Sequence, residues 1–340
     1  MTMNDRVDEY LWDPAAPPDR QVLAIESSLS AARFDPERRP LQLPERRAGS
    51  AAGWPLWRSL AAAAALILVA GAGYAAWRWS WPDNRPWFVA AAPAGSPARL
   101  PVGSRLDLSA GETALVDVAR IGTMRVSGGS SVTLRATASN RHLLSLDRGS
   151  VHVRVWAPPF SVVFQTPAGE VRDVGCEFQL EVDGSEVRVR VVSGWVQLDN
   201  LQGEILVPAG ASSEMITSRR PGVPVFDDAV PGFREAVRRL EAAPGDAAGV
   251  VDRVAALARP RDVLTLLHLV NRGVPARHRL VEQAAELWPP PDQAIINRVL
   301  QGDDRALWEW RDSLPLPPVK GWWRNWRDAL PLWLLDGNAQ

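Results

Sequence analysis

The chain has 340 residues, of which 38 are lysine or arginine and 39 are aspartate or glutamate, so its formal net charge at pH 7 is −1. This balance gives no overall attraction to nucleic acid, and we expect no nucleic-acid partner. A single cysteine, Cys176, excludes an internal disulfide framework.

Residues 1–53 are predicted to be a cytoplasmic tail with one short amphipathic helix and a linker rich in proline and arginine. Asp19 stands where a helix N-cap belongs, and apolar residues follow at spacings of three and four over about residues 20–33. A single helix cannot bury such a face alone, so it needs the membrane surface, a second copy of the chain or a partner protein. The alternative is a tail that matters only for membrane insertion. The candidate partner contacts are Trp12, Val22, Ile25 and Leu29.

Residues 54–78 are predicted to form a transmembrane helix. The stretch Ser59–Ala76 has no charged side chain, and as a helix it would be about 27 Å long, close to the thickness of the hydrocarbon core of a bilayer. The alternative is a buried core helix, although soluble helices of this length rarely lack charge. Aromatic residues near both ends resemble the belt found at membrane interfaces. These residues are Trp54, Trp57, Tyr74, Trp77, Trp79 and Trp81.

The arginines around this stretch predict its orientation. The N-terminal side carries Arg39, Arg46, Arg47 and Arg58, whereas the C-terminal side carries Arg78 and Arg85. Since cytoplasmic flanks are richer in positive charge, we expect a single-pass inner-membrane protein with a cytoplasmic N-terminus. Everything that follows the span would then lie in the periplasm.

Residues 79–101 are predicted to be an extended stalk, because prolines and small residues dominate the segment. Residues 102–220 then alternate apolar with polar side chains, as in Ser131–Ala138 and Glu186–Gly194. Alternation with period two is typical of strands with one buried face, and glycines punctuate the runs. We therefore expect an all-β domain of about ten short strands, either a sandwich or a roll.

Within the β region, Phe164–Asn200 resembles the signature half of the FecR domain, and the resemblance extends over about residues 102–215. In that family a "TP.G" strand leads to a "lGT.F.V" strand, a "V.V..G.V.v" hairpin and a "l.aGe" strand. Cys176 replaces the usual threonine, and Ala211 replaces the glutamate that often follows the last glycine. The main matching residues are Thr166, Pro167, Gly169, Gly175, Phe178, Gly194, Val196 and Gly210.

The resemblance implies a regulator. FecR-like proteins cross the inner membrane once, hold or assist an extracytoplasmic-function sigma factor with their cytoplasmic N-terminus, and receive a signal with their periplasmic part. The larger N-terminal helical domain and the C-terminal secretin/TonB short domain of the family are not evident here. By this resemblance the signature residues are structural, and a sigma factor is the expected partner of the tail.

Residues 228–340 are predicted to be an α-helical domain, because the period changes to that of helices and proline or glycine separates short segments. We expect a compact bundle or a short stack of helix pairs. The tail Val319–Asp336 is rich in tryptophan. Its apolar side chains would either lie in a membrane interface or pack on the preceding helices. They are Trp322, Trp326, Leu330 and Trp333.

No motif in the chain indicates catalysis. The four histidines, His142, His152, His268 and His278, have no metal-ligand spacing such as HExxH. Cys176 lies on an alternating strand, which favours a buried thiol over a nucleophile. We therefore expect no enzyme activity, no metal and no cofactor.

The overall prediction is a multidomain α+β protein with one transmembrane helix, an all-β FecR-like domain and an all-α C-terminal bundle. As a function we expect a membrane-anchored regulator whose periplasmic part binds an unknown protein or ligand. The alternative is a scaffolding module of the envelope without a signalling role.

Overall fold

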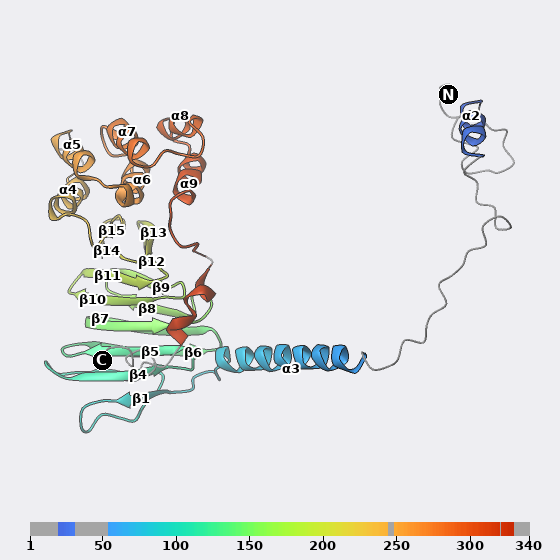
Figure 1. The fold of residues 1–340 in the computed structure, drawn as a ribbon. Coiled ribbons are helices and arrows are strands. Elements are labelled where there is room, and N and C mark those ends of the chain that lie inside the picture. Colours follow the sequence, from blue (N-terminus) through green and yellow to red (C-terminus); the bar gives the residue numbers. More distant parts are fainter. Residues whose placement is uncertain (1–19, 31–53, 244–247, 320, 330–340) are drawn as a thin grey trace, which may run out of the picture. The chain divides into compact units, whose positions relative to one another are not determined.

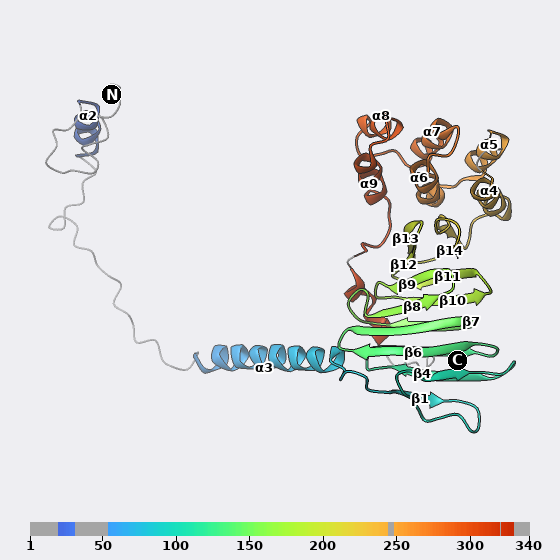
Figure 2. The ribbon, with the colours of Figure 1, turned by 180° about the vertical axis from the view of Figure 1, so that it is seen from behind.

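The computed structural model describes residues 20–30, 54–243, 248–319 and 321–329 (Figures 1 and 2). It shows a mixed α+β protein with a large sheet and several helices. Helix α2, Arg20–Leu29, forms at the predicted position but is shorter than expected, and none of its side chains is buried. Val22 is half-buried, whereas Ile25 and Leu29 are exposed. The fourth candidate contact, Trp12, lies outside the described residues.

Helix α3, Trp54–Trp79, contains the apolar stretch. Its segment Leu60–Trp79 has a mean hydropathy of 1.8. None of its side chains is buried, although Trp79 at its end is partly covered by the β region. Among the described residues it is the one helix long and apolar enough to cross a membrane. The exposed stretch is not a buried core helix, the alternative that the sequence left open.

The strands form a 15-stranded sheet whose main path runs β13-β12-β9-β8-β7-β10-β11-β14-β15. The strands up to β7 are β1 Trp87–Ala91, β2 Arg99–Leu100, β3 Arg105–Asp107, β4 Thr113–Val118, β5 Gly122–Ser127, β6 Ser131–Ala138 and β7 Arg141–Val155. The following ones are β8 Val162–Thr166, β9 Gly169–Asp173, β10 Glu177–Asp183, β11 Glu186–Ser193, β12 Trp195–Asn200, β13 Gly203–Pro208, β14 Ala211–Ile216 and β15 Val225–Phe226.

Strand β7 joins two rows of strands, and Figure 1 shows the strands stacked one above another. Its first half pairs with β6 and, in parallel, with β8, whereas its second half pairs with β5 and β10. Gly149 lies between the two halves at φ +89°, and a Cβ there would be 2.4 Å from the Cα of Ser130. Glycine therefore allows β7 to change rows where another strand approaches closely.

The structure corrects the predicted stalk over residues 79–101. Strand β1 pairs with β2 and β4, with Trp87 opposite Leu100 and Val89 opposite Val116. Trp81, Trp87 and Leu100 are buried in the core. The segment is therefore part of the β region, which extends from β1 to β15 rather than over residues 102–220. The prolines fall before or between the strands, where they remove no ladder hydrogen bond.

The C-terminal region contains helices that the sequence pattern predicted. In α4 the buried residues recur at helical spacing, and Pro231 stands at the first position, where its missing N–H is harmless. Asp303 caps α9 by accepting hydrogen bonds from the backbone N–H groups of Arg305 and Ala306. The helices are α4 Pro231–Ala242, α5 Ala248–Leu257, η3 Pro260–Asp262, α6 Val263–Asn271, α7 Arg277–Leu287, α8 Ala294–Leu300, α9 Asp304–Asp312 and η4 Trp322–Ala329.

Candidate functional site

The last turn of α3 is attached to the β region through Arg120, which follows strand β4. Its Nη1 donates hydrogen bonds to the carbonyl oxygens of Trp77, at 2.9 Å, and Ser80, at 3.1 Å. The guanidinium carbon also lies 4.3 Å from the ring centroid of Trp77. Carbonyls at the C-terminus of a helix lack partners within the helix and carry partial negative charge. Arg120 therefore caps α3 from a different element and fixes the end of the apolar helix.

Three tryptophans from distant parts of the sequence meet at the same place. The ring centroids of Trp79 and Trp156 are 5.9 Å apart, and that of Trp322 lies 5.6 Å from the first and 5.3 Å from the second. Trp79 ends α3, Trp156 follows β7, and Trp322 begins η4. Such tilted and edge-on contacts are favourable beyond the area they bury. We name Trp79, Trp156 and Trp322, together with Arg120, the junction.

Two signature glycines lie beside the junction. Gly175 adopts φ +76°, and a Cβ on it would be 2.4 Å from the Cβ of Trp322. Gly194, at φ +69°, lies against the Gly175 carbonyl oxygen and the side-chain nitrogen of Asn325. Asn325 Nδ2 donates a hydrogen bond of 3.1 Å to that carbonyl. The C-terminal segment thus packs on a turn that only glycine fits.

The turn at Gly175 is organised by the buried carboxylate of Asp173. Its Oδ1 accepts hydrogen bonds from the backbone N–H groups of Gly175 and Cys176, both at 3.0 Å, and from the Cys176 thiol at 2.6 Å. Cys176 is completely buried. The expectation of a buried thiol is confirmed, and a group in this position can serve as a hydrogen-bond donor but not as an accessible nucleophile.

The other signature residues do not join the junction. Phe178 packs edge-on against Phe164 in the core, with ring centroids 6.1 Å apart. Val196 is buried in β12. The hydroxyl of Thr166 donates to the carbonyl of Gly169 across the β8–β9 turn at 2.7 Å. Pro167 and Gly210 also lie in turns, and a Cβ on Gly210 would be 2.7 Å from Nη2 of Arg261.

His142, on β7, packs against Trp81, which follows the end of α3. Its ring contacts those of Trp81 and Trp87 edge-on, at centroid distances of 6.5 and 5.4 Å. Burial lowers the pKa of His142 to about 4, because the charged imidazolium would lose its hydration. Trp81 therefore belongs to the core of the β region, where its indole N–H donates to the Arg85 carbonyl, and not to the aromatic belt that the sequence predicted.

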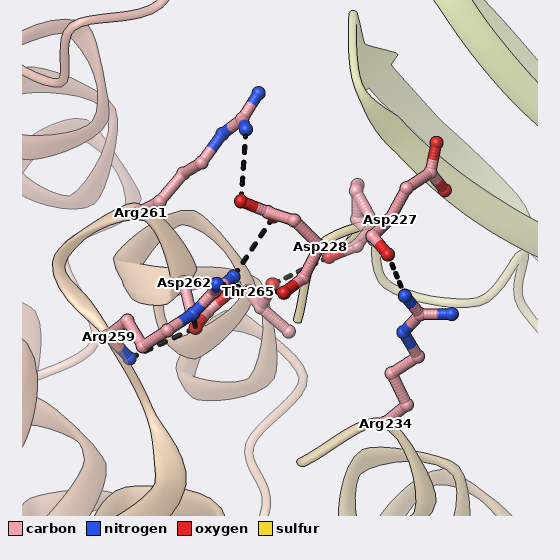
Figure 3. Close-up of polar contacts among 8 residues, drawn as sticks. Asp227, Asp228, Arg234, Arg259, Arg261, Asp262 and Thr265 are labelled. Carbon is pink, nitrogen blue, oxygen red and sulfur yellow. Dashed lines mark hydrogen bonds and ion pairs between the residues drawn. The ribbon is translucent and has the colours of Figure 1, made fainter. Parts of the chain in front are cut away.

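A second polar cluster ties β15 to the C-terminal helices (Figure 3). Asp262 is completely buried and accepts hydrogen bonds from the backbone N–H of Arg259 at 3.0 Å and from its Nε at 2.8 Å. Arg259 also donates to the backbone carbonyl and the carboxylate of Asp228, at 2.8 and 3.0 Å. The hydroxyl of Thr265 donates to the carbonyl of Pro224 at 2.7 Å. These contacts hold the start of α6 against the chain that leaves the sheet.

Arg259 holds the pKa of the Asp228 carboxyl below its usual range, mainly through their hydrogen bond. Asp228 nonetheless remains largely exposed, so water screens this ion pair. No group of three histidine, cysteine, aspartate or glutamate side chains within the described part of the chain is arranged to hold a metal ion.

Sequence reasoning missed most of the junction. It placed Trp79 at the membrane and Trp322 in the tail, and it singled out neither Arg120, Trp156 nor Asn325. The sequence signal for Trp156 and Arg120 was that both follow runs of alternating apolar and polar residues. The contacts themselves join residues more than 30 positions apart, and no local pattern reveals such pairs. Trp322 meets neither of the two expectations for the tail, because it packs on the β region at Trp156. Leu330 and Trp333 lie outside the described residues.

Comparisons with known proteins find only weak structural similarity. No family model matches the chain, and no curated protein matches it. The FecR resemblance of the motifs therefore has no matching family model behind it. Among solved structures, the chain is similar to two crystal structures, at 1.65 and 2.50 Å, of a candidate anti-sigma factor from Parabacteroides distasonis ATCC 8503.

The two likenesses have TM-scores of 0.33 and 0.32 and sequence identities of 15% and 14%. Each covers 39% of this chain and 63% of the other, which is less than two thirds of the length of that protein. A likeness at this level carries no argument about function.

Proposed function

We propose that the chain is a membrane-anchored regulator of the FecR type, with α3 as its span in the inner membrane. In this proposal the N-terminal tail lies in the cytoplasm, where α2 contacts an extracytoplasmic-function sigma factor. The β region and the C-terminal helices lie in the periplasm and receive the signal. The protein has no enzymatic activity and needs neither a metal nor a cofactor.

The junction is the observation that supports this proposal most directly. Trp79 and the capped carbonyls of Trp77 and Ser80 belong to the end of α3, whereas Trp322 belongs to the segment that follows the C-terminal helices. A change in how that segment packs therefore alters the surroundings of the last turn of the span.

The exposed face of α2 supports the cytoplasmic half of the proposal. Ile25 and Leu29 are exposed, at 57% and 59%, on a helix that has no buried side chain. An isolated ten-residue helix is only marginally stable in water, and a partner that covers its apolar face would stabilise it. This is the helix-in-groove mode of recognition.

Capture of the full-length protein from its native cells tests the partner. With an affinity tag at the N-terminus and cross-linking before lysis, we expect recovery of a sigma factor. The variant Ile25→Asp/Leu29→Asp should lose the sigma factor and change the transcription that depends on it. The control Ser27→Asp places the same charge on the opposite face of α2 and should retain the partner.

Two outcomes would refute the proposal. If the tail recovers no sigma factor and its deletion leaves transcription unchanged, a scaffolding role in the envelope becomes the better explanation. If a reporter enzyme fused after Gln340 is active only in the cytoplasm, the proposed topology is wrong.

A further inference from the structure

A charged cleft lies between the sheet and the C-terminal helices, away from the junction. Its walls come from β11 and β14, from the loop 217–222 that follows β14, and from α4 and α6. Its volume is about 870 Å³, within the range of pockets that bind small molecules. Figure 1 shows β11, β14, α4 and α6 on the same side of the molecule.

The cleft has more positive than negative charge. Five arginines and three glutamates line it. Arg188 pairs with Glu186 at 2.8 Å and with Glu214 at 3.2 Å, and the third glutamate, Glu241, pairs with Arg272 at 2.5 Å. Each of the three lining glutamates is therefore already paired with an arginine of the cleft.

The other three arginines of the cleft are available to bind a ligand. Arg219 and Arg220 form no ion pair within the described residues, and both are exposed. Within the described residues Arg238 pairs only with Glu235, and both of these side chains are more than half exposed. An exposed pair of this kind contributes little and is readily exchanged for a better anion.

Contacts at the floor of the cleft hold the arginine-bearing loop in place. Glu241 accepts a hydrogen bond of 2.8 Å from the backbone N–H of Val223, and Arg272 donates to the carbonyl of Pro221. Both contacts fix the end of the loop 217–222. Burial raises the pKa of Glu241, and the positive charges of Arg272 and Arg219 oppose that rise.

Apolar side chains complete the lining. Leu240 belongs to α4, Leu269 to α6, Val274 to the loop after α6, and Ile216 to the end of β14. Leu240 and Leu269 are fully buried, so a ligand in the cleft would meet guanidinium groups at the loop and the half-buried side chain of Ile216. Guanidinium groups bind phosphate and carboxylate through two parallel hydrogen bonds, which an ammonium group cannot reproduce.

We propose that this cleft binds a small organic anion that carries two or more phosphate or carboxylate groups. Arg219 and Arg220 would hold the anionic groups, Arg238 would assist, and Ile216 would contact the organic part. The bound anion would bridge the sheet and the C-terminal helices and stabilise their contact. This inference goes beyond the proposed function, and either can fail without the other.

Calorimetric titration of the full-length protein in a non-ionic detergent tests the proposal. The probes are inorganic pyrophosphate and citrate, with acetate as the singly charged control. We expect saturable binding of at least one of the two polyanions, no binding of acetate, and weaker binding at higher salt concentration. Comparison of the two polyanions decides whether phosphate or carboxylate is preferred, and equal binding of both supports the shared chemistry.

Variants assign the binding to the cleft. The double variant Arg219→Ala/Arg220→Ala should bind at least about tenfold more weakly, because two charge-assisted contacts are lost. Both side chains are exposed and without ion pairs, so its thermal unfolding should match that of the wild type. Arg239→Ala removes an exposed arginine from α4 outside the cleft and should bind as the wild type does.

The proposal is overturned if neither polyanion saturates the protein at millimolar concentration. It is also overturned if the double variant binds as tightly as the wild type, because the ligand would then lie elsewhere. Neither result bears on the sigma factor, which is tested by capture through the tail.

Discussion

The side-chain amide of Asn325 donates a hydrogen bond to the backbone carbonyl of Gly175, although 150 positions separate the two residues. A second bond of the same kind joins the indole N–H of Trp195 to the carbonyl of Pro317, at 2.9 Å. The segment after the last helix is thus tied to the turn at Gly175, next to the end of the apolar helix. The segment that follows the C-terminal helices therefore contacts the β region beside the junction.

Substitution of Gly175 should release the C-terminal segment. In Gly175→Ala the new Cβ would overlap with Trp322, and the residue would also have to keep a positive φ. We expect a loss of about 2–4 kcal/mol in the free energy of unfolding, together with faster proteolysis around residues 315–325. Denaturant unfolding and limited proteolysis measure the two effects.

Gly184→Ala provides the control for backbone strain. Gly184 has φ +58° in the β10–β11 turn, and nothing lies within 4 Å of a Cβ placed there. This variant should lose about 1 kcal/mol and leave the proteolysis of the C-terminal segment unchanged. If both variants behave alike, the segment is not held by its contact with Gly175.

Loss of the Arg120 side chain should loosen the end of α3. Arg120→Ala removes the donors to the carbonyls of Trp77 and Ser80 and the contact with the Trp77 ring. We expect hydrogen exchange at the backbone amides of residues 77–81 to become about tenfold faster, which corresponds to about 1.4 kcal/mol. Arg125→Ala, an exposed arginine on β5, should leave exchange there unchanged. Equal exchange in Arg120→Ala and wild type would contradict the capping role.

Stability should decrease as the pH falls from about 6.5 to 4, in part because of His142. Its pKa is about 4 in the folded protein and about 6.5 in an unfolded chain, so only the unfolded state binds the proton in this window. Above pH 6.5 the neutral, buried His142 makes its full contribution to the free energy of unfolding. Acidification to pH 4 lowers that free energy by about 3 kcal/mol.

The variant His142→Phe keeps a ring between Trp81 and Trp87 and removes the titrating group. Its free energy of unfolding should depend less steeply on pH between 4 and 6.5 than that of the wild type. His278→Phe changes an exposed histidine and should retain the wild-type slope. Thermal unfolding at a series of pH values distinguishes the variants, and an unchanged slope in His142→Phe would exclude this histidine as the cause.

The buried carboxylate of Asp262 should contribute more than its exposed neighbour Asp228. Asp262→Asn replaces an acceptor of three hydrogen bonds from Arg259 by an amide that can satisfy only part of them. We expect a loss of about 2–4 kcal/mol. Asp228→Asn should lose less than about 1 kcal/mol, because this carboxylate is 54% exposed. Equal losses in chemical denaturation would contradict the difference.

Helix α3 offers a small-residue surface for association. Nothing in the protein lies within 4 Å of a Cβ placed on Gly71 or Gly73. Small residues allow membrane helices to approach closely, so α3 should self-associate through Gly71 and Ala75. Gly71→Ile/Ala75→Ile should weaken association by about tenfold in a membrane-based reporter assay. The control Leu68→Ile conserves size, and unchanged association in the double variant would exclude this face.

The sequence by itself determined the elements whose cause is local. The uncharged stretch predicts α3, alternation predicts strands such as β10 and β11, and helical spacing with capping residues predicts α4 and α9. Each depends on residues within one element, because side-chain periodicity follows from the backbone geometry of that element. The buried position of Cys176 was predicted in the same way.

Only the tertiary structure decided where these elements meet. Residues 79–101 join the sheet because Trp87 and Val89 find partners in Leu100 and Val116, and proline content alone could not show that. The junction and the cleft unite side chains from distant segments, such as Trp79 with Trp322 and Arg188 with Glu214. Whether a tryptophan faces lipid or a core, and whether an arginine is paired or free, depends on packing that no local sequence pattern specifies.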